Sequence, residues 1–108
     1  TIRRPPRYTL CPYPALFRAR YEQAILDCNK AIKIDPDYPN PYKHRAVAQE
    51  SLDNYDEALA DLTKAIELDP DYQKAYAARA EVYTELNQPE NAKADELKAQ
   101  ELEENQTP

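Results

Sequence analysis

The sequence contains no glycine, tryptophan or methionine, and its 108 residues include only one histidine and two cysteines. Without glycine, the chain cannot form the glycine-rich loops that cradle phosphate groups. One histidine and two cysteines without metal-ligand spacing argue against a zinc site. No apolar run approaches the roughly 18 residues that a membrane span needs, and no secretory signal pattern is present. We therefore expect no cofactor, no metal and no membrane association.

Acidic residues dominate the charge, since 20 Asp and Glu against 14 Lys and Arg give a formal net charge of -6. Nucleic-acid binding depends on neutralising phosphates, so this balance disfavours a nucleic-acid partner. In an acidic, alanine-rich chain, Cys11 and Cys28 are expected to be ordinary buried thiols in a reducing compartment, and we expect the cytoplasm. Because residue 1 is Thr, we expect a fragment, a processed form or a partly ordered chain.

Large apolar residues are also scarce: Leu, Ile, Val and Phe together number 18. With a net charge, such a composition is typical of disordered chains. However, 16 alanines and nine tyrosines recur at regular intervals. Large rings opposite small residues can pack densely, and disordered segments keep no register. The periodicity therefore predicts a folded chain.

The sequence contains an internal repeat. The string KAIKIDPDY ends at Tyr38, and the string KAIELDPDY ends at Tyr72. Extension from these anchors gives the registers 5–38, 39–72 and 73–106, which define a 34-residue period. The second and third registers match along their whole length, and the first matches mainly in its latter half.

Each full register has the residue spacing of two amphipathic helices. Asp53 and Asn87 follow the first helix of their registers, where a left-handed cap normally requires glycine and Asp or Asn is the next-best residue. We expect an all-α chain with helices at about 21–34, 41–53, 56–68, 74–87 and 90–103. The residues expected to be buried are Tyr42, Ala46, Ala58, Leu62, Ala65, Tyr76 and Ala80. A small residue at Ala46 is expected to let the two helices of one hairpin cross closely.

The pattern resembles the tetratricopeptide repeat, a helix-turn-helix unit with Tyr, a small residue, two alanines and Pro at fixed positions. The matching residues are Tyr42, Ala46, Tyr55, Ala58, Ala65 and Pro70 in the second register, and Tyr76, Ala80, Tyr83, Ala92 and Ala99 in the third. The resemblance covers about residues 21–106, or two and a half repeats. It implies an α-solenoid of antiparallel helix-turn-helix repeats. It also implies a protein–protein interaction module that binds a peptide or partner protein in its concave groove.

By this resemblance, the first helix of each repeat lines the groove. The residues expected to face a partner are Asn40, Lys43, His44, Val47, Glu50, Lys74, Ala77, Ala78 and Glu81. The lysines are suited to a carboxylate, and Val and Ala are suited to apolar contact.

One subfamily clamps the C-terminal carboxylates of chaperone tails with two Lys, two Asn and an Arg. Only Lys74 matches that set here, because Thr9, Tyr13, His44 and Ala78 occupy the other four positions. The adjacent Arg79 belongs to the helix-packing side. We therefore expect weak or no binding of a peptide that ends Glu-Glu-Val-Asp.

The residues predict no catalytic site. His44 lies between Lys43 and Arg45, whose charges favour its neutral form, and it has no oriented partner. The carboxylates are expected on exposed helix faces, paired with nearby lysines as Asp61 with Lys64 and Glu101 with Lys98. We expect no enzymatic activity.

Residues 1–20 differ from the remaining chain, because they contain five arginines and no acidic residue. The first helix of register 5–38 should lie here, but Pro12 and Pro14 interrupt it at about 3 kcal/mol each. The segment is either a basic arm that docks onto an acidic surface, nucleic acid or another subunit, or a flexible leader, or a stretch foreign to the native chain.

A disrupted first helix would leave the apolar flank of the next helix without its usual cover. We expect Ile25, Cys28 and Ile32 to be available there to a homo- or hetero-oligomeric partner. The alternative function is therefore a structural segment of a larger solenoid or multisubunit assembly, docked through the basic arm.

Overall fold

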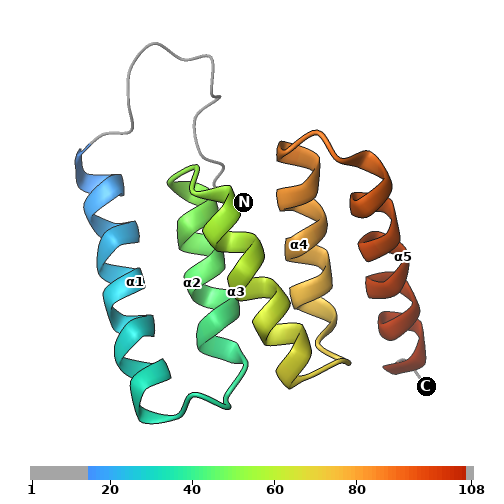
Figure 1. Cartoon of the computed structure of the whole chain (residues 1–108), viewed down its shortest axis with the longest axis horizontal. Coiled ribbons are helices and arrows are strands. Elements are labelled where there is room, and N and C mark those ends of the chain that lie inside the picture. Colours follow the sequence, from blue (N-terminus) through green and yellow to red (C-terminus); the bar gives the residue numbers. More distant parts are fainter. Residues whose placement is uncertain (1–14, 107–108) are drawn as a thin grey trace.

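The structure is a computed structural model that describes residues 15–106. It consists of five helices, with no strand among the described residues (Figure 1). Their bounds are α1 Ala15–Ile34, α2 Asn40–Ser51, α3 Tyr55–Leu68, α4 Gln73–Glu85 and α5 Pro89–Gln106. The predicted all-α class is confirmed. Thr9, Cys11, Pro12, Tyr13 and most of the expected basic arm lie outside the described residues.

The helices pack as successive antiparallel hairpins. α2 pairs with α3 and α4 with α5, while α1 packs on α2 and α3 packs on α4 (Figure 1). α2 and α4, the first helices of the two complete hairpins, also touch each other. This stacking is the predicted α-solenoid, in which α1 takes the place of the second helix of the first repeat.

Four of the helices begin and end within three residues of the predicted bounds. The exception is α1, which begins at Ala15 instead of residue 21. The repeat match is weak before Tyr21, so the period gave no signal there. Residues 15–20 are nevertheless mostly Ala, Leu and Arg, which are strong helix formers and extend α1 by propensity alone.

The first helix of each complete hairpin, α2 and α4, is followed by a residue in the left-handed conformation that is not glycine, as predicted. Asp53 has a φ of 63° and Asn87 a φ of 59°. After α2, the Asp53 N–H donates to the Glu50 carbonyl at 2.9 Å and the Asn54 N–H donates to the Gln49 carbonyl at 2.8 Å. These two bonds form a Schellman motif, which satisfies carbonyl groups at the helix end.

The two DPDY segments form equivalent turns. The Asp35 carboxylate accepts the Asp37 N–H at 3.1 Å. The Tyr42 hydroxyl, from the next helix, donates to the Pro36 carbonyl at 2.9 Å. The same bonds recur in the next repeat, from Asp71 to Asp69 at 3.1 Å and from Tyr76 to Pro70 at 3.0 Å. The DPDY segments, which mark the repeat in the sequence, therefore also form the hydrogen bonds that hold neighbouring repeats together.

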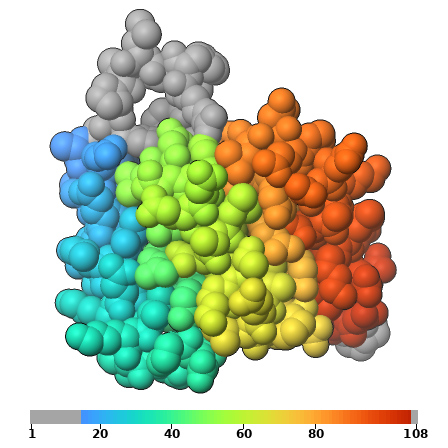
Figure 2. Space-filling model, viewed as in Figure 1, coloured from blue at the N-terminus to red at the C-terminus, as the bar shows by residue number. Residues whose placement is uncertain are grey.

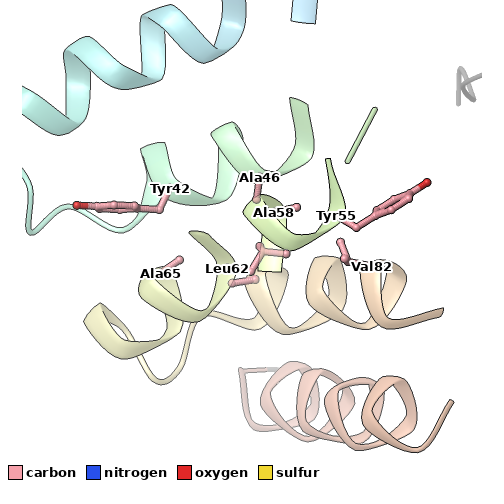
Figure 3. Packing of buried hydrophobic residues seen from close by; sticks show 8 residues of the cluster. Tyr42, Ala46, Tyr55, Ala58, Leu62, Ala65 and Val82 are labelled. Atoms are coloured by element: carbon pink, nitrogen blue, oxygen red, sulfur yellow. The ribbon is translucent and has the colours of Figure 1, made fainter. Parts of the chain in front are cut away.

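The core is built from alanines and a few larger side chains (Figure 3). Ala46, Ala58 and Ala65 have no exposed surface, and Leu62 and Val82 are the largest fully buried side chains. Small residues let the helices approach closely, so this core reaches its packing density with few large aliphatic groups. Figure 3 shows Ala46 of α2 beside Ala58 of α3, where the two helices cross.

Six of the seven residues predicted to be buried are buried, and the prediction for Tyr76 is wrong, because its side chain is only half-buried. Its counterpart Tyr42 is 8% exposed. In the last hairpin, α5 has an exposed Glu96 where α3 has the buried Leu62. That hairpin therefore offers less apolar surface to cover a ring.

The exposed apolar residues of α1 differ from those expected. Ile25, Cys28 and Ile32 are half-buried, and Ile32 packs against the core. The most exposed apolar side chains are instead Leu16 at 69% and Ile34 at 84%, near the two ends of the helix, and Leu26 at 54% in its middle. α1 has no buried residue at all.

The outer face of α5 is polar. Its exposed residues include Lys93, Glu96, Gln100, Glu103 and Glu104, as a terminal repeat requires for solubility. We expect amide hydrogens of residues 90–104 to exchange faster than those of 56–68. Among the five described helices, α5 packs only against α4, whereas α3 packs against both α2 and α4. Native-state hydrogen exchange measures this difference. Equal protection of both segments would mean that another molecule covers α5.

Candidate functional site

The nine residues predicted to face a partner all lie on α2 and α4. Five are on α2 and four on α4, each at the three-to-four spacing of one helical face. None of the nine is buried, because each is at least partly open to solvent. We call this set the groove face: Asn40, Lys43, His44, Val47, Glu50, Lys74, Ala77, Ala78 and Glu81.

The side chains of the groove face differ in exposure. His44, Lys74 and Glu81 are exposed, and Val47 has 40% of its surface open to solvent. Lys43, Glu50 and the two alanines are half-buried, and Ala78 also packs against the core. Asn40 is held at the start of α2, where its Nδ2 donates to the Tyr38 hydroxyl at 2.9 Å. The face thus combines a small apolar floor with charged groups.

The charges of the two helices interact across the face. Burial lowers the pKa of Lys43, and the positive charge of Lys74 lowers it further, while Glu81 acts in the opposite direction. Burial, Lys43 and Lys74 together lower the pKa of His44 below its ordinary 6.5. The environment therefore favours the neutral form of His44.

Arg45 and Arg79 lie on the packing side of the same helices. The Arg45 guanidinium donates from Nε and Nη2 to the two carboxylate oxygens of Asp61, at 2.7 and 2.6 Å. Arg79 bonds Asp95 in the same way, at 2.7 and 2.9 Å. The predicted placement of Arg79 is therefore confirmed, and its charge belongs to the helix packing and not to the groove face.

Each arginine also reaches the preceding repeat. Arg45 Nη1 donates to the Asn29 side chain of α1 at 2.9 Å, and Arg79 Nη1 donates to the Thr63 hydroxyl of α3 at 3.3 Å. Each guanidinium thus joins three helices. This contact fixes α2 relative to α1 and α4 relative to α3, and so sets the relative position of the two helices that carry the groove face.

The expectation of exposed carboxylates is wrong for two residues. Asp61 is 7% exposed and Asp95 5% exposed, and Asp61 pairs with Arg45 instead of Lys64. The cause is tertiary, because the partner lies on another helix. A signal was present in the sequence, because the spacing from Arg45 to Asp61 recurs from Arg79 to Asp95 in the next repeat. The expected pair of Lys98 and Glu101 is confirmed at 3.8 Å.

The described residues form neither a metal site nor a membrane-spanning helix. No group of three His, Cys, Asp or Glu side chains within residues 15–106 is arranged to hold a metal ion. No helix in this part of the chain has the length and apolar character to cross a membrane. Cys28 is a free, half-buried thiol.

The chain is similar to known proteins in sequence and in fold. Two family models described as tetratricopeptide repeat match residues 15–83 and 73–106. The second TPR of Spaghetti (RPAP3), solved with the HSP90 peptide SRMEEVD, is 35% identical, with a TM-score of 0.73 and 76% of each chain covered. The first TPR of the same protein, solved with the same peptide, is 32% identical, with a TM-score of 0.77 over 83% of this chain and 71% of that one.

A longer relative shares the fold. MamA (MSR-1) is 28% identical with a TM-score of 0.75, and the match covers 82% of this chain but 51% of MamA. This chain therefore spans about half of that protein. No curated protein matches the sequence significantly. The repeat period, the stacked hairpins and the two family models agree that the chain belongs to the tetratricopeptide repeat family.

Proposed function

We propose that the chain binds an extended segment of a partner protein on the groove face, with Lys43 and Lys74 as its anion contacts. The observation that carries this proposal is the placement of two like charges on touching helices. Neither lysine forms a salt bridge within residues 15–106. Their repulsion is unfavourable in the free protein, and an anionic group between them would relieve it. The peptide complexes of the similar RPAP3 domains support a peptide ligand in general.

The same face disfavours a ligand with many negative charges. Glu81 lies close enough to Lys43 to influence its pKa, and Glu50 belongs to the same face of α2. The whole chain carries a net charge of -6, which repels an acidic segment over a long range at low salt. The face therefore suits a segment that combines one carboxylate with neutral or basic side chains.

We expect calorimetric titration to distinguish two synthetic peptides. A peptide ending Glu-Glu-Val-Asp should bind weakly or not at all, whereas one with a single terminal carboxylate and neighbouring basic residues should bind better. Each charge-assisted contact contributes about 1.5–3 kcal/mol, so Lys74→Ala should weaken the better ligand at least tenfold. Binding should strengthen as pH falls through the lowered pKa of His44, because the protonated ring adds a third positive charge.

The matched control is Lys64→Ala, which removes an exposed lysine from α3 outside the groove face. This variant should bind the peptide like the unaltered chain. Tight binding of the Glu-Glu-Val-Asp peptide, lost on Lys74→Ala, would contradict the proposed charge preference. It would assign the chain a role in capturing chaperone tails.

The second candidate function is a structural segment of a larger assembly. Its support is the match to about half of MamA, together with Arg18 and Arg20, which are exposed on α1. Failure of both peptide classes in the titration would favour this candidate.

A further inference from the structure

The three second helices can be compared position by position along the repeat period. Five residues of α3 are buried: Tyr55, Ala58, Asp61, Leu62 and Ala65. In α5, the counterparts Ala92, Asp95 and Ala99 are also buried. In α1, the counterparts are Tyr21, Ala24, Asp27, Cys28 and Ala31, and none is buried. The face that α3 and α5 pack against their first helices is therefore only partly covered in α1.

Within the described residues, Asp27 lacks the arginine partner that its counterparts in α3 and α5 have. Its counterparts Asp61 and Asp95 each bind two guanidinium nitrogens from the first helix of their own repeat. Within the described residues, Asp27 is exposed, forms no ion pair and accepts one hydrogen bond, from Gln23 Nε2 at 3.1 Å. The residue one full period before Arg45 is Cys11, which has no guanidinium to offer.

The arginines with the matching register are already used inside the molecule. Arg45 holds Asp61, and Arg79 holds Asp95. A second copy of the chain would therefore have to break a core contact to supply the same helix. α1 lies along one edge of the molecule, at the opposite end of the solenoid from α5 (Figure 2). These contacts favour an occupant from a different protein.

We propose that the face of α1 formed by Ala24, Asp27 and Ala31, here called the α1 docking face, binds an amphipathic helix of a partner protein that donates an arginine to Asp27. The chain itself shows the pattern that fits. α2 directs Arg45 to Asp61 of α3, and α4 directs Arg79 to Asp95 of α5. Each guanidinium lies beside the tyrosine three residues earlier, 5.8 Å from the ring of Tyr42 and 5.7 Å from the ring of Tyr76, and each is followed by a buried alanine. The partner helix therefore contains Tyr, then Arg three residues later, then a small residue. The small residue lets its backbone approach the two alanines, as Ala46 does in the core.

This site is separate from the groove face. It recognises a helix through α1, whereas the groove face recognises an extended segment through α2 and α4. A partner helix on α1 would lie against α1 as α2 lies against α3, and it would leave Lys43 and Lys74 open. The proposal for the α1 docking face can therefore be tested independently of the proposed peptide binding.

The test uses a synthetic helix taken from this chain. A labelled peptide with the sequence of residues 39–52, PNPYKHRAVAQESL, is titrated into the full chain by fluorescence anisotropy. A helix this short is marginal in water, so binding should be weak, and peptide concentrations up to the millimolar range are needed. Asp27→Asn in the chain, or Gln in place of Arg45 in the peptide, should each weaken binding at least tenfold. Asp71→Asn, the same change at an exposed residue of the α3–α4 turn, should have no effect.

Three results would overturn the proposal. The first is the absence of binding, or equal binding by Asp27→Asn. The second is a dimer of the unaltered chain in sedimentation that Asp27→Asn dissociates, because a second copy would then occupy the face. The third is a drop in the thermal midpoint of Asp27→Asn as large as that of Asp61→Asn, because the chain would then already cover Asp27 itself.

Discussion

Arg79→Leu is expected to lower the free energy of unfolding by about 3–5 kcal/mol, the range for removing one partner of a buried ion pair. The substitution leaves the Asp95 carboxylate, whose side chain is 8% exposed, without the two donors at 2.7 and 2.9 Å. It also removes the guanidinium from the rings of Tyr76 and Tyr83, whose centroids lie 5.7 and 5.8 Å away. Chemical denaturation followed by circular dichroism measures the loss.

The cause of the loss is testable with a second substitution. Most of the cost comes from burying a carboxylate that has lost its hydrogen bonds, not from the lost attraction. Arg79→Leu combined with Asp95→Leu should therefore recover a large part of the stability. Lys98→Ala serves as the control, because it breaks the exposed pair with Glu101 at 3.8 Å and should change stability by less than about 1 kcal/mol. A loss in Arg79→Leu no greater than in this control would show that the buried pair contributes little.

The same arginine couples stability to the geometry of the groove face. Arg79 ties α4 to α5 and to Thr63 of α3, as Arg45 ties α2 to α3 and to Asn29 of α1. The hydrogen bonds that Arg79 donates to Asp95 raise the pKa of the Arg79 guanidinium, so the arginine keeps the positive charge that the contact needs. Because Lys43 and Lys74 lie on the helices that these arginines fix, the packing side of each first helix determines how its groove side is presented.

The repeat period allowed most of the fold to be predicted from sequence, because each repeat forms the same local bonds. The left-handed Asp53 and Asn87 and the close-packed Ala46 follow from local chemistry. The burial of Asp61 and Asp95 was missed, because the spacing of residues on one helix says nothing about an arginine on another. Recurrence of residue pairs, and not only of single residues, carries that information.

The two helices that carry the candidate site were predictable from the sequence, but the electrostatics of the site were not. The 34-residue period places Lys43 and Lys74 on successive first helices, α2 and α4. These two helices touch each other in the structure. The lowered pKa of Lys43 depends on partial burial and on the approach of Lys74, and both are tertiary properties. The open face of α1 is likewise a tertiary property, because it consists in the contrast between the exposed Asp27 and its two paired counterparts, Asp61 and Asp95.

Ala46→Leu is expected to cost about 1–3 kcal/mol, because a larger side chain forces apart helices that touch through alanine. Ala46 and Ala58 have no exposed surface, and both belong to the core cluster that joins α2 to α3. The matched control is Ala60→Leu, the same change at an exposed residue of α3, which should leave the stability nearly unchanged. Urea denaturation should show a lower midpoint with an unchanged slope for Ala46→Leu alone. Since α2 would move relative to α4, this variant should also bind the groove-face peptide more weakly, although Ala46 itself is buried. An unchanged midpoint would mean that the hairpin crossing tolerates a leucine at this position, and that close approach of α2 and α3 does not depend on a small residue.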